Sequence, residues 1–193
     1  MNINILLSSI YSKIMKKEIE LKILNIEPKK IKEKIEKVGG EQILGPTLFH
    51  ELYFESSAQK QRYSSFRLRL EGGVSILNLK MENEVSEQFE IRDEYEVEVS
   101  DFETTKKILE LAGFTVFRER EKMREAYRIG SVRIEIDTYP NIKPYIELES
   151  ETEEDIKKLV ELLGFNMKDT TKNTATVILK EAGLDPNKLK FSD

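Results

Sequence analysis

Hydrophobic and polar residues alternate with a period of two in six short segments of this chain. In the first segment, residues 18–23, Glu18, Glu20 and Lys22 share one face and three apolar residues share the other. Because successive side chains of a β-strand point to opposite faces, the alternation predicts strands that each have one apolar and one charged face. The other five segments are FRLRL at 66–70, ILNLK at 76–80, EYEVEV at 94–99, VRIEID at 132–137 and YIELE at 145–149.

Four segments with helical spacing and recognisable ends accompany these strands. Asp101 and Thr152 are placed to cap two of the helices, and glycine follows each helical segment. The sequence EGG at 71–73 predicts a hairpin turn between two of the strands. The predicted helices cover residues 28–40, 101–114, 152–165 and about 173–183. Strands and helices in this order predict an α+β fold.

The length of 193 residues suits a single domain. We expect a domain at 16–185, preceded by an N-terminal extension at 1–15 that is either non-native or disordered and followed by a C-terminal tail at 186–193. The N-terminal run has neither the basic start nor the cleavage site of a signal peptide. No segment has the ~18 consecutive apolar residues of a membrane helix. We therefore expect a cytoplasmic protein that does not bind a membrane.

The composition excludes several kinds of function. Acidic residues number 36 and basic residues 31, which gives a net charge of −5 and argues against a nucleic-acid-binding protein. The chain has no cysteine, so it has neither a thiolate nucleophile nor a thiolate metal site. Its single histidine, His50, lies in the apolar-aromatic run LFHELYF, and we interpret it as a partly buried structural residue.

The charged strand faces fit two arrangements. An open antiparallel sheet would pack its apolar face on helices and expose its charged face to water, and the alternation alone slightly favours this arrangement. A closed barrel would instead enclose the charged faces. Small barrels usually fill their interior with apolar side chains, so a polar interior implies a ligand.

Two details favour a closed antiparallel β-barrel with helices packed outside. The charged faces consist almost wholly of Glu, Asp, Arg and Lys, and the signs segregate, with basic residues at 67 and 69 and acidic residues at 94, 96, 98, 147 and 149. Enclosing such charges is costly unless they are paired or bind a charged ligand. A polyphosphate with a divalent cation would use both signs, because Arg and Lys bind phosphate oxygens whereas carboxylates bind Mg²⁺ or Mn²⁺.

The order of the charged positions resembles the CYTH superfamily, the triphosphate tunnel enzymes. This superfamily includes class IV adenylate cyclases, thiamine triphosphatases and inorganic triphosphatases. The sequence EIELK at 18–22 is similar to the Glu-x-Glu-x-Lys signature of the family, and the resemblance extends over about residues 16–165. The later motifs are Arg-x-Arg at Arg67 and Arg69, a lysine at Lys80, Arg-x-Glu at Arg92 and Glu94, Lys-x-Arg at Lys122 and Arg124, a strand ending in Asp137, and Glu-x-Glu at Glu147 and Glu149.

The resemblance implies a triphosphate tunnel and a role for each of these residues. The implied triphosphate-binding residues are Lys22, Arg67, Arg69, Lys80, Lys122 and Arg124. The implied ligands of one or two Mg²⁺ or Mn²⁺ ions are Glu18, Glu20, Asp137, Glu147 and Glu149. Glu18, Glu20 and Lys22 are the expected catalytic residues, and Glu96 and Glu98 share the parity of Glu94 and would support either set.

Two departures from the family pattern concern the organic part of the substrate. Related cyclases and thiamine triphosphatases tend to have a glycine-containing turn before the last Glu-x-Glu strand, where this chain has TYPNIKP with Pro140 and Pro144. The Ser-Tyr element near the C-terminus of the family has no clear counterpart in TTKNTATVILKEAG.

The resemblance favours a class IV adenylate cyclase, which converts ATP to cyclic AMP and pyrophosphate. The alternatives are a triphosphatase that hydrolyses inorganic triphosphate, thiamine triphosphate or a nucleoside triphosphate, and a module that binds a polyphosphate or nucleotide without turnover. Tyr53, Phe54 and Tyr127 would provide a wall for a nucleobase, or else belong to the ordinary core. The expected partner is a small-molecule triphosphate, and the sequence leaves a homodimer open.

Overall fold

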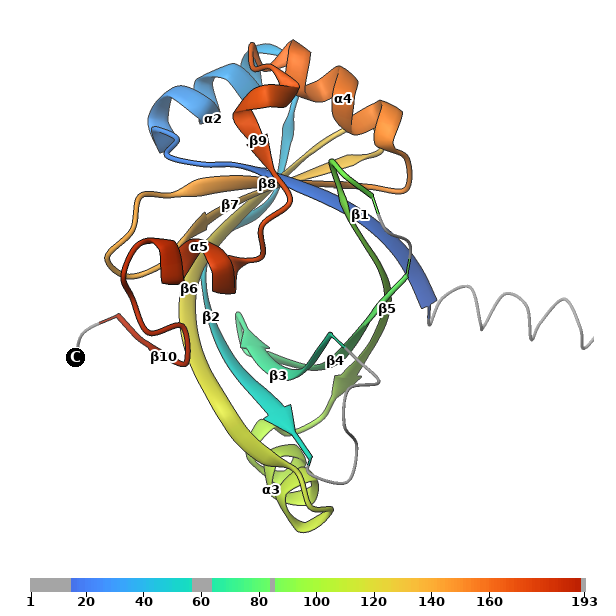
Figure 1. Cartoon of the computed structure of the whole chain (residues 1–193), viewed down its shortest axis with the longest axis vertical. Helices are drawn as coiled ribbons and strands as arrows, with labels where there is room; N and C mark the ends of the chain where they lie inside the picture. Colours follow the sequence, from blue (N-terminus) through green and yellow to red (C-terminus); the bar gives the residue numbers. More distant parts are fainter. Residues whose placement is uncertain (1–14, 57–63, 84–85, 192–193) are drawn as a thin grey trace, which may run out of the picture.

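The computed structural model describes residues 15–56, 64–83 and 86–191, so the predicted extension at 1–15 lies almost entirely outside the described residues (Figure 1). The barrel strands are β1 (Met15–Ile23), β2 (Glu41–Glu55), β3 (Ser65–Glu71), β4 (Val74–Glu82), β5 (Glu90–Val99), β6 (Thr115–Ile129), β7 (Val132–Thr138) and β8 (Tyr145–Ser150). The helices are α2 (Pro28–Lys37), α3 (Phe102–Leu111), α4 (Glu153–Leu162), α5 (Ala175–Glu181) and the 3₁₀ helix η1 (Met167–Asp169), and the short strands are β9 (Thr170–Thr171) and β10 (Lys188–Leu189).

The eight long strands form one closed antiparallel barrel. They are hydrogen-bonded in the order β6-β2-β3-β4-β5-β1-β8-β7, and β6 also pairs with β7, which closes the ring. Figure 1 shows this ring of strands face on, with α2 and α4 at one end of the view and α3 at the other. The predicted α+β fold with a closed antiparallel barrel and helices outside is therefore confirmed.

All six segments with period-two alternation form strands, and the EGG sequence forms the turn between β3 and β4. The barrel needs two further strands, β2 and β6, which at 15 residues each are the longest. Simple alternation does not identify them. In β6, charged residues stand at successive positions, as in RERE at 118–121, so apolar and polar residues do not alternate. In β2, the pairing with β6 shifts register between Gln42 and Leu44, between Leu44 and Thr47, and between Tyr53 and Phe54. Each such bulge inserts a residue that interrupts the alternation of faces.

The four predicted helices are present, each somewhat shorter than its predicted segment. The Asp101 side chain accepts a hydrogen bond from the Thr104 amide at 2.6 Å, and Thr152 accepts one from Asp155 at 3.3 Å. Both caps satisfy backbone donors that the first helical turn leaves without a partner. The helix starts predicted from Asp101 and Thr152 are thus confirmed.

The barrel packs its apolar core on its outside, beneath the helices. Leu21, Ile134 and Leu148 are fully buried there, together with Ile35 of α2 and Ile156 of α4. Burial of such a side chain contributes roughly 1.5–3 kcal/mol, and a one-residue slip of a strand would lose this contribution along its length. Because the apolar side chains pack against the helices outside the barrel, the charged side chains of the same strands point into the barrel.

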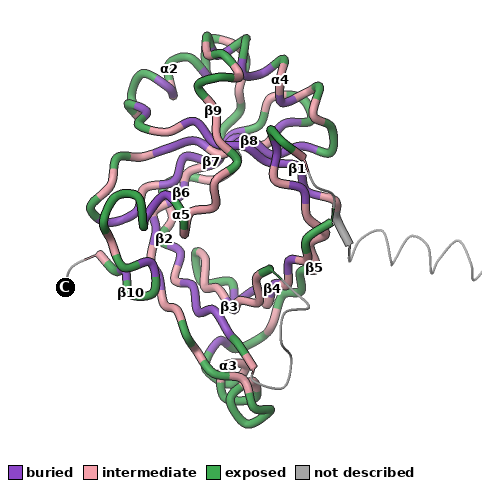
Figure 2. Tube along the Cα trace, viewed as in Figure 1, coloured by how far each residue is buried: buried purple, intermediate pink, exposed green. Residues whose placement is uncertain are grey.

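Residues of the segment predicted as a C-terminal tail, 186–193, pack against the barrel. Strand β10 pairs in parallel with β6, and Leu189 is buried in a cluster with Leu179 of α5 and with Tyr139 and Tyr145. The buried positions of the described residues can be followed in Figure 2. None of the helices in the described part of the chain combines the length and the apolar character needed to span a bilayer.

Candidate active site in the barrel interior

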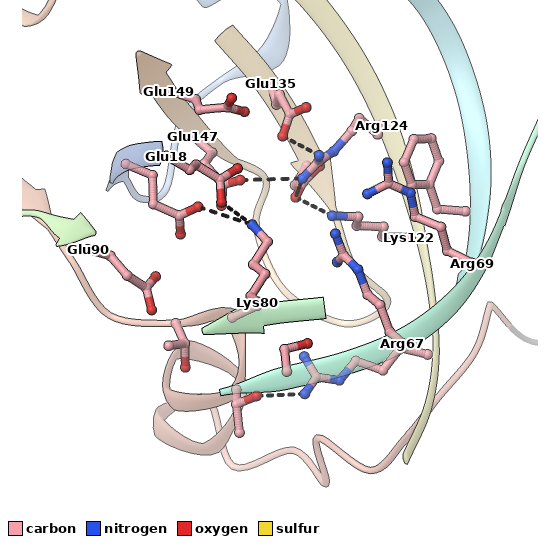
Figure 3. A pocket seen from close by; sticks show the side chains of 18 of the residues that line it. Glu18, Arg67, Arg69, Lys80, Glu90, Lys122, Arg124, Glu135, Glu147 and Glu149 are labelled. Carbon is pink, nitrogen blue, oxygen red and sulfur yellow. Dashed lines mark hydrogen bonds and ion pairs between the residues drawn. The ribbon is translucent and has the colours of Figure 1, made fainter. Parts of the chain in front are cut away.

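The interior of the barrel holds a cavity of about 590 Å³ that is lined mainly by charged side chains. Figure 3 shows basic and acidic side chains from several strands pointing into it. Every residue assigned above to the triphosphate-binding, metal-binding and catalytic sets lines this cavity: Glu18, Glu20, Lys22, Arg67, Arg69, Lys80, Lys122, Arg124, Asp137, Glu147 and Glu149. The structure thus brings all the predicted site residues together, whereas the roles assigned to them stay predictions.

Two lysines lie among the carboxylates of β1 and its neighbours. The Lys22 Nζ is 2.5 Å from Glu20 Oε1 and 3.0 Å from Glu147 Oε2. The Lys80 ammonium contacts Glu18 and lies 3.9 Å from Glu20 Oε2. Both ammonium groups are almost completely buried, and their pKa values stay raised because the surrounding carboxylates outweigh the effect of burial. These lysines are therefore charged at neutral pH.

Arg124 and Lys122 of β6 bind Asp137 of the neighbouring strand β7. The Arg124 Nε donates to Asp137 Oδ1 and its Nη2 to Oδ2, both at 2.6 Å, and Lys122 Nζ donates to Oδ2 at 3.0 Å. Such a two-pronged arginine–carboxylate contact is both strong and geometrically specific. Arg124 also contacts Glu135, and its Nη2 lies 3.6 Å from Glu147 Oε1.

The predicted metal ligands are partners of the predicted triphosphate-binding cations. Lys22 and Lys80 contact Glu18, Glu20 and Glu147, and the Lys122–Arg124 pair contacts Asp137. The described residues place no three carboxylates or imidazoles together in a group that could hold a metal ion. The carboxylate oxygens point to the basic groups, so the acidic and basic sets neutralise one another.

The donor chemistry of the carboxylates nevertheless fits a divalent cation. Glu20 stands directly opposite Glu149 in the pairing of β1 with β8, and Glu18 precedes Glu20 on the same face. Burial raises the pKa of Glu18 to about 8, and neighbouring carboxylates add to this effect against the opposing charge of Lys80. Closely spaced, buried carboxylate oxygens that repel one another are ligands suited to Mg²⁺ or Mn²⁺.

Several residues of the site were not identified from the sequence. Glu51 is fully buried and accepts hydrogen bonds from Arg67 Nη1 at 2.9 Å and from Tyr53 at 3.1 Å. Arg120 is 1% exposed and donates to Pro186 O and to Thr176 Oγ1, each at 2.6 Å. Arg120 lines the cavity, whereas Glu51 lies behind the wall and holds Arg67. Further lining residues outside the predicted motifs include Glu90, Arg118, Arg133, Glu135, Tyr139 and Tyr145. Most of them stand an even number of positions from a predicted site residue on the same strand and therefore point to the same face, as Arg120 does with Lys122. This spacing is the signal that could have identified them.

The aromatic residues proposed as a nucleobase wall divide between two places. Tyr53 lines the cavity. Phe54 and Tyr127 do not, because they lie on the outer face of their strands and pack in the two outer core clusters, so that part of the hypothesis is wrong. His50 is partly buried outside the cavity, where its Nε2 lies 2.7 Å from Glu119, in agreement with a structural role. Glu98 is exposed and does not line the cavity.

Replacing Glu51 with glutamine should destabilise the protein, and the effect should depend on pH. Burial alone would raise the pKa of Glu51, but the charges of Lys122 and Arg67 outweigh it and lower the pKa to about 2. The unfolded chain therefore takes up this proton first as the pH falls. The resulting stability of about 3 kcal/mol is complete above about pH 4.5 and is lost towards pH 2.

We therefore expect Glu51→Gln to lower the free energy of unfolding by about 3–5 kcal/mol at pH 7, because buried cations lose their partner. The difference in the free energy of unfolding between this variant and the unmodified protein should narrow as the pH approaches 2. Urea unfolding at several pH values measures both effects, with Glu98→Gln as the control at an exposed glutamate on β5. A Glu51→Gln difference that stays constant with pH would contradict this account.

Comparisons with known proteins place the chain in a family. The model of the CYTH domain matches residues 16–176. No curated protein matches the chain. Among solved structures, the PH1012 protein of Pyrococcus horikoshii is 25% identical, with a TM-score of 0.67 over 81% of this chain and 96% of that one.

Two further structures share the fold at lower identity. A candidate adenylate cyclase from Vibrio parahaemolyticus is 16% identical, with a TM-score of 0.71 over 86% of this chain and 98% of that one. HpAC1 of Hippeastrum, a candidate adenylyl cyclase reported to have a dominant triphosphatase activity, is 20% identical, with a TM-score of 0.56 over 86% and 88%. Since the family model spans most of the sequence and the fold agrees, the chain belongs to the CYTH domain family.

Proposed function

We propose that the protein is a divalent-metal-dependent triphosphatase whose preferred substrate is inorganic triphosphate. The observation that carries this proposal is the composition of the cavity wall, which offers many cations for phosphate oxygens but no open aromatic surface for a nucleobase. Ten basic and ten acidic side chains line the cavity. The two signs are balanced in number, so the binding of a polyanion depends on local contacts with individual cations.

The aromatic side chains of the cavity are already in contact with cations or with one another. The Tyr53 ring has the guanidinium carbons of Arg118 and Arg120 at 5.1 and 5.2 Å from its centroid. Phe49 has Arg69, Lys122 and Arg124 within 5.8 Å. The remaining pair, Tyr139 and Tyr145, stack on each other with their centroids 6.2 Å apart. A base would have to displace these partners, whereas a bare phosphate chain would not.

The C-terminal segment contributes to the same wall. Thr174, Ala175 and Thr176, at the start of α5, line the cavity, and Arg120 holds this segment through Thr176 and Pro186. Ala175 packs against the cluster that contains Tyr139, and Arg120 lies over the ring of Tyr53, so these contacts occupy the surroundings of both tyrosines. They support a substrate that consists of phosphate alone.

The cations of the cavity would bind and orient the phosphate chain for hydrolysis. Lys22 and Lys80 would neutralise it at the β1 side, and Lys122 and Arg124 at the β6 side, since all four are held in the cavity by partners on neighbouring strands. When bound to the carboxylates, Mg²⁺ or Mn²⁺ would supply charge neutralisation and orient the reacting groups. Positioning and charge neutralisation are the main contributions that a protein makes to phosphoryl transfer.

Binding of the substrate requires the basic and acidic sets to separate. Several contacts, such as Lys22–Glu147 and Arg124–Asp137, join a predicted triphosphate-binding cation to a predicted metal ligand. A phosphate chain that takes the cation leaves a buried carboxylate without a partner, which is costly unless another cation replaces it. We therefore expect Mg²⁺ to raise the affinity for tripolyphosphate at constant ionic strength, and calorimetry with and without Mg²⁺ measures this coupling. Equal affinity in both conditions would contradict it.

The volume of the cavity supports a second candidate function, the cyclisation of ATP expected from the family resemblance. About 590 Å³ lies within the range of pockets that hold drug-sized ligands, and so exceeds the needs of a small anion. Attack of the ribose 3′-oxygen on the α-phosphorus would require the nucleoside to lie within the barrel, next to Tyr53 and Tyr139. The covered aromatic faces weigh against this placement.

A substrate panel distinguishes the candidates. Purified protein is assayed with inorganic triphosphate, thiamine triphosphate, ATP and GTP, each with Mg²⁺ and with Mn²⁺, and all products are identified. Orthophosphate released fastest from inorganic triphosphate, without a cyclic nucleotide, supports the proposed triphosphatase. Cyclic AMP and pyrophosphate from ATP would replace it with the cyclase, and binding of these compounds without turnover would indicate a binding module.

A further inference from the structure

The hydroxyl group of Tyr145 is an unused hydrogen-bond donor in the cavity wall. Tyr145 is 1% exposed and lines the cavity at the start of β8. Its hydroxyl oxygen is buried and has no hydrogen-bond partner among the described residues. Leaving a buried polar group without a partner destabilises a protein, and the great majority of such groups are satisfied.

The carboxylate across from Tyr145 on the neighbouring strand is bound to cations. Asp137 is the residue directly opposite Tyr145 in the pairing of β7 with β8. Both carboxylate oxygens of Asp137 already accept hydrogen bonds from Arg124, and one also accepts a bond from Lys122. The phenol therefore lies on the strand next to a carboxylate that already accepts three hydrogen bonds from two cations.

The ring of Tyr145 is held firmly in place. It stacks on Tyr139 with an interplanar angle of 20°, and both rings belong to a buried cluster with Leu179 of α5 and Leu189 of β10. A phenylalanine would make the same ring contacts, so packing alone gives no reason for the hydroxyl. A side chain that lines a binding cavity and is fixed by packing is typical of a ligand-orienting position.

We propose that the Tyr145 hydroxyl donates a hydrogen bond to an oxygen of the bound phosphate chain, next to Arg124 and Lys122, and acts as a substrate-positioning residue. This inference rests on the proposed function because it assumes that the phosphate chain occupies the barrel. A phenol is protonated at neutral pH and can donate to an anionic oxygen. The ligand would thus satisfy the one group that the ligand-free protein leaves without a partner at this position.

The proposal has a signature that a purely structural role would not produce. Tyr145→Phe removes a hydroxyl that has no partner in the ligand-free protein, so the melting temperature without ligand should stay the same or rise. The same change should weaken phosphate-chain binding on the order of tenfold, because a hydrogen bond to a charged group is lost. The melting temperature of the ligand-free variant should therefore not fall, whereas its affinity for the phosphate chain should.

Tyr127→Phe provides the matched control. The Tyr127 hydroxyl lies on the outer side of β6, where it donates to Glu125 Oε2 at 3.4 Å and accepts from Gln42 at 3.3 Å. Its removal should lower the melting temperature slightly and leave phosphate binding unchanged. The two variants carry the same chemical change and have opposite expected results.

The experiment measures binding of a methylene-bridged tripolyphosphate in Mg²⁺ by calorimetry, together with thermal unfolding of the ligand-free proteins. Weaker binding by Tyr145→Phe with undiminished stability supports the proposal. Equal affinity, or a loss of stability as large as that of Tyr127→Phe, overturns it while the proposed function stands. If the unmodified protein does not bind the analogue, both proposals fall, whereas binding without hydrolysis of inorganic triphosphate overturns the proposed function alone.

Discussion

Replacement of Glu20 by glutamine should lower kcat for inorganic triphosphate on the order of 10²-fold or more. Glu20 is 5% exposed, accepts a hydrogen bond from Lys22 at 2.5 Å and stands opposite Glu149. Glutamine has nearly the same shape but removes the negative charge that we assign to metal binding. Tripolyphosphate should still bind without Mg²⁺, and at least as tightly, because the basic side chains remain and one competing carboxylate is gone.

Steady-state assays over a range of Mg²⁺ concentrations and calorimetry without Mg²⁺ measure the two halves of this prediction. Glu147→Gln should behave in the same way, since Glu147 is the other close partner of Lys22. Glu98→Gln is the control because Glu98 is an exposed glutamate of β5 that does not line the cavity. Full activity of both Glu20→Gln and Glu147→Gln, with unchanged metal dependence, would remove these residues from the site.

Replacement of Arg124 by alanine should instead weaken the binding of tripolyphosphate itself by about 10²-fold or more. Arg124 is 7% exposed and presents its guanidinium between Asp137, Glu135 and Glu147. It has three carboxylate partners in the cavity wall, and a phosphate chain would take the place of some of them. The weaker binding should raise both KM and the dissociation constant of tripolyphosphate.

The alanine variant also leaves Asp137 without its principal partner, so its thermal stability has to be measured alongside. Arg124→Lys keeps the positive charge but not the two-pronged contact, and we expect it to fold and still bind more weakly than the unmodified protein. Arg128→Ala, on the same strand at an exposed position, should leave binding unchanged. If Arg124→Lys and Arg124→Ala both fold and bind tripolyphosphate normally, the phosphate chain does not lie at Arg124.

The sequence identifies a large part of the fold and of the site. Period-two alternation identifies β1 and five other strands, and the motif order of the family selects residues such as Lys22, Arg67 and Asp137, all of which line one cavity. These predictions succeed because alternation is a local property of a strand. In a regular strand without a bulge, a residue two positions from a known lining residue points to the same face.

The positions that the sequence analysis does not identify depend on long-range pairing. The bulges in β2 interrupt its alternation, so neither this strand nor the role of its buried Glu51 is apparent from the pattern. Tyr145 shares the parity of Glu147, but only the packing of α5 and β10 around its ring shows that its hydroxyl is buried without a partner. Arg120 likewise has the right parity, and its bonds to Thr176 and Pro186 come from residues more than 50 positions away.

By itself, the sequence determined which side chains share a strand face and where the helices begin, because alternation and helix caps act over a few residues. The tertiary structure alone decided that the sheet closes through β6 and β7 and that the charged faces therefore meet in one interior. It also decided which cation pairs with which carboxylate. Contacts such as Lys80–Glu18 and Arg124–Asp137 depend on the register of strands distant in the sequence, and that register follows from the outward packing of the apolar residues beneath the helices.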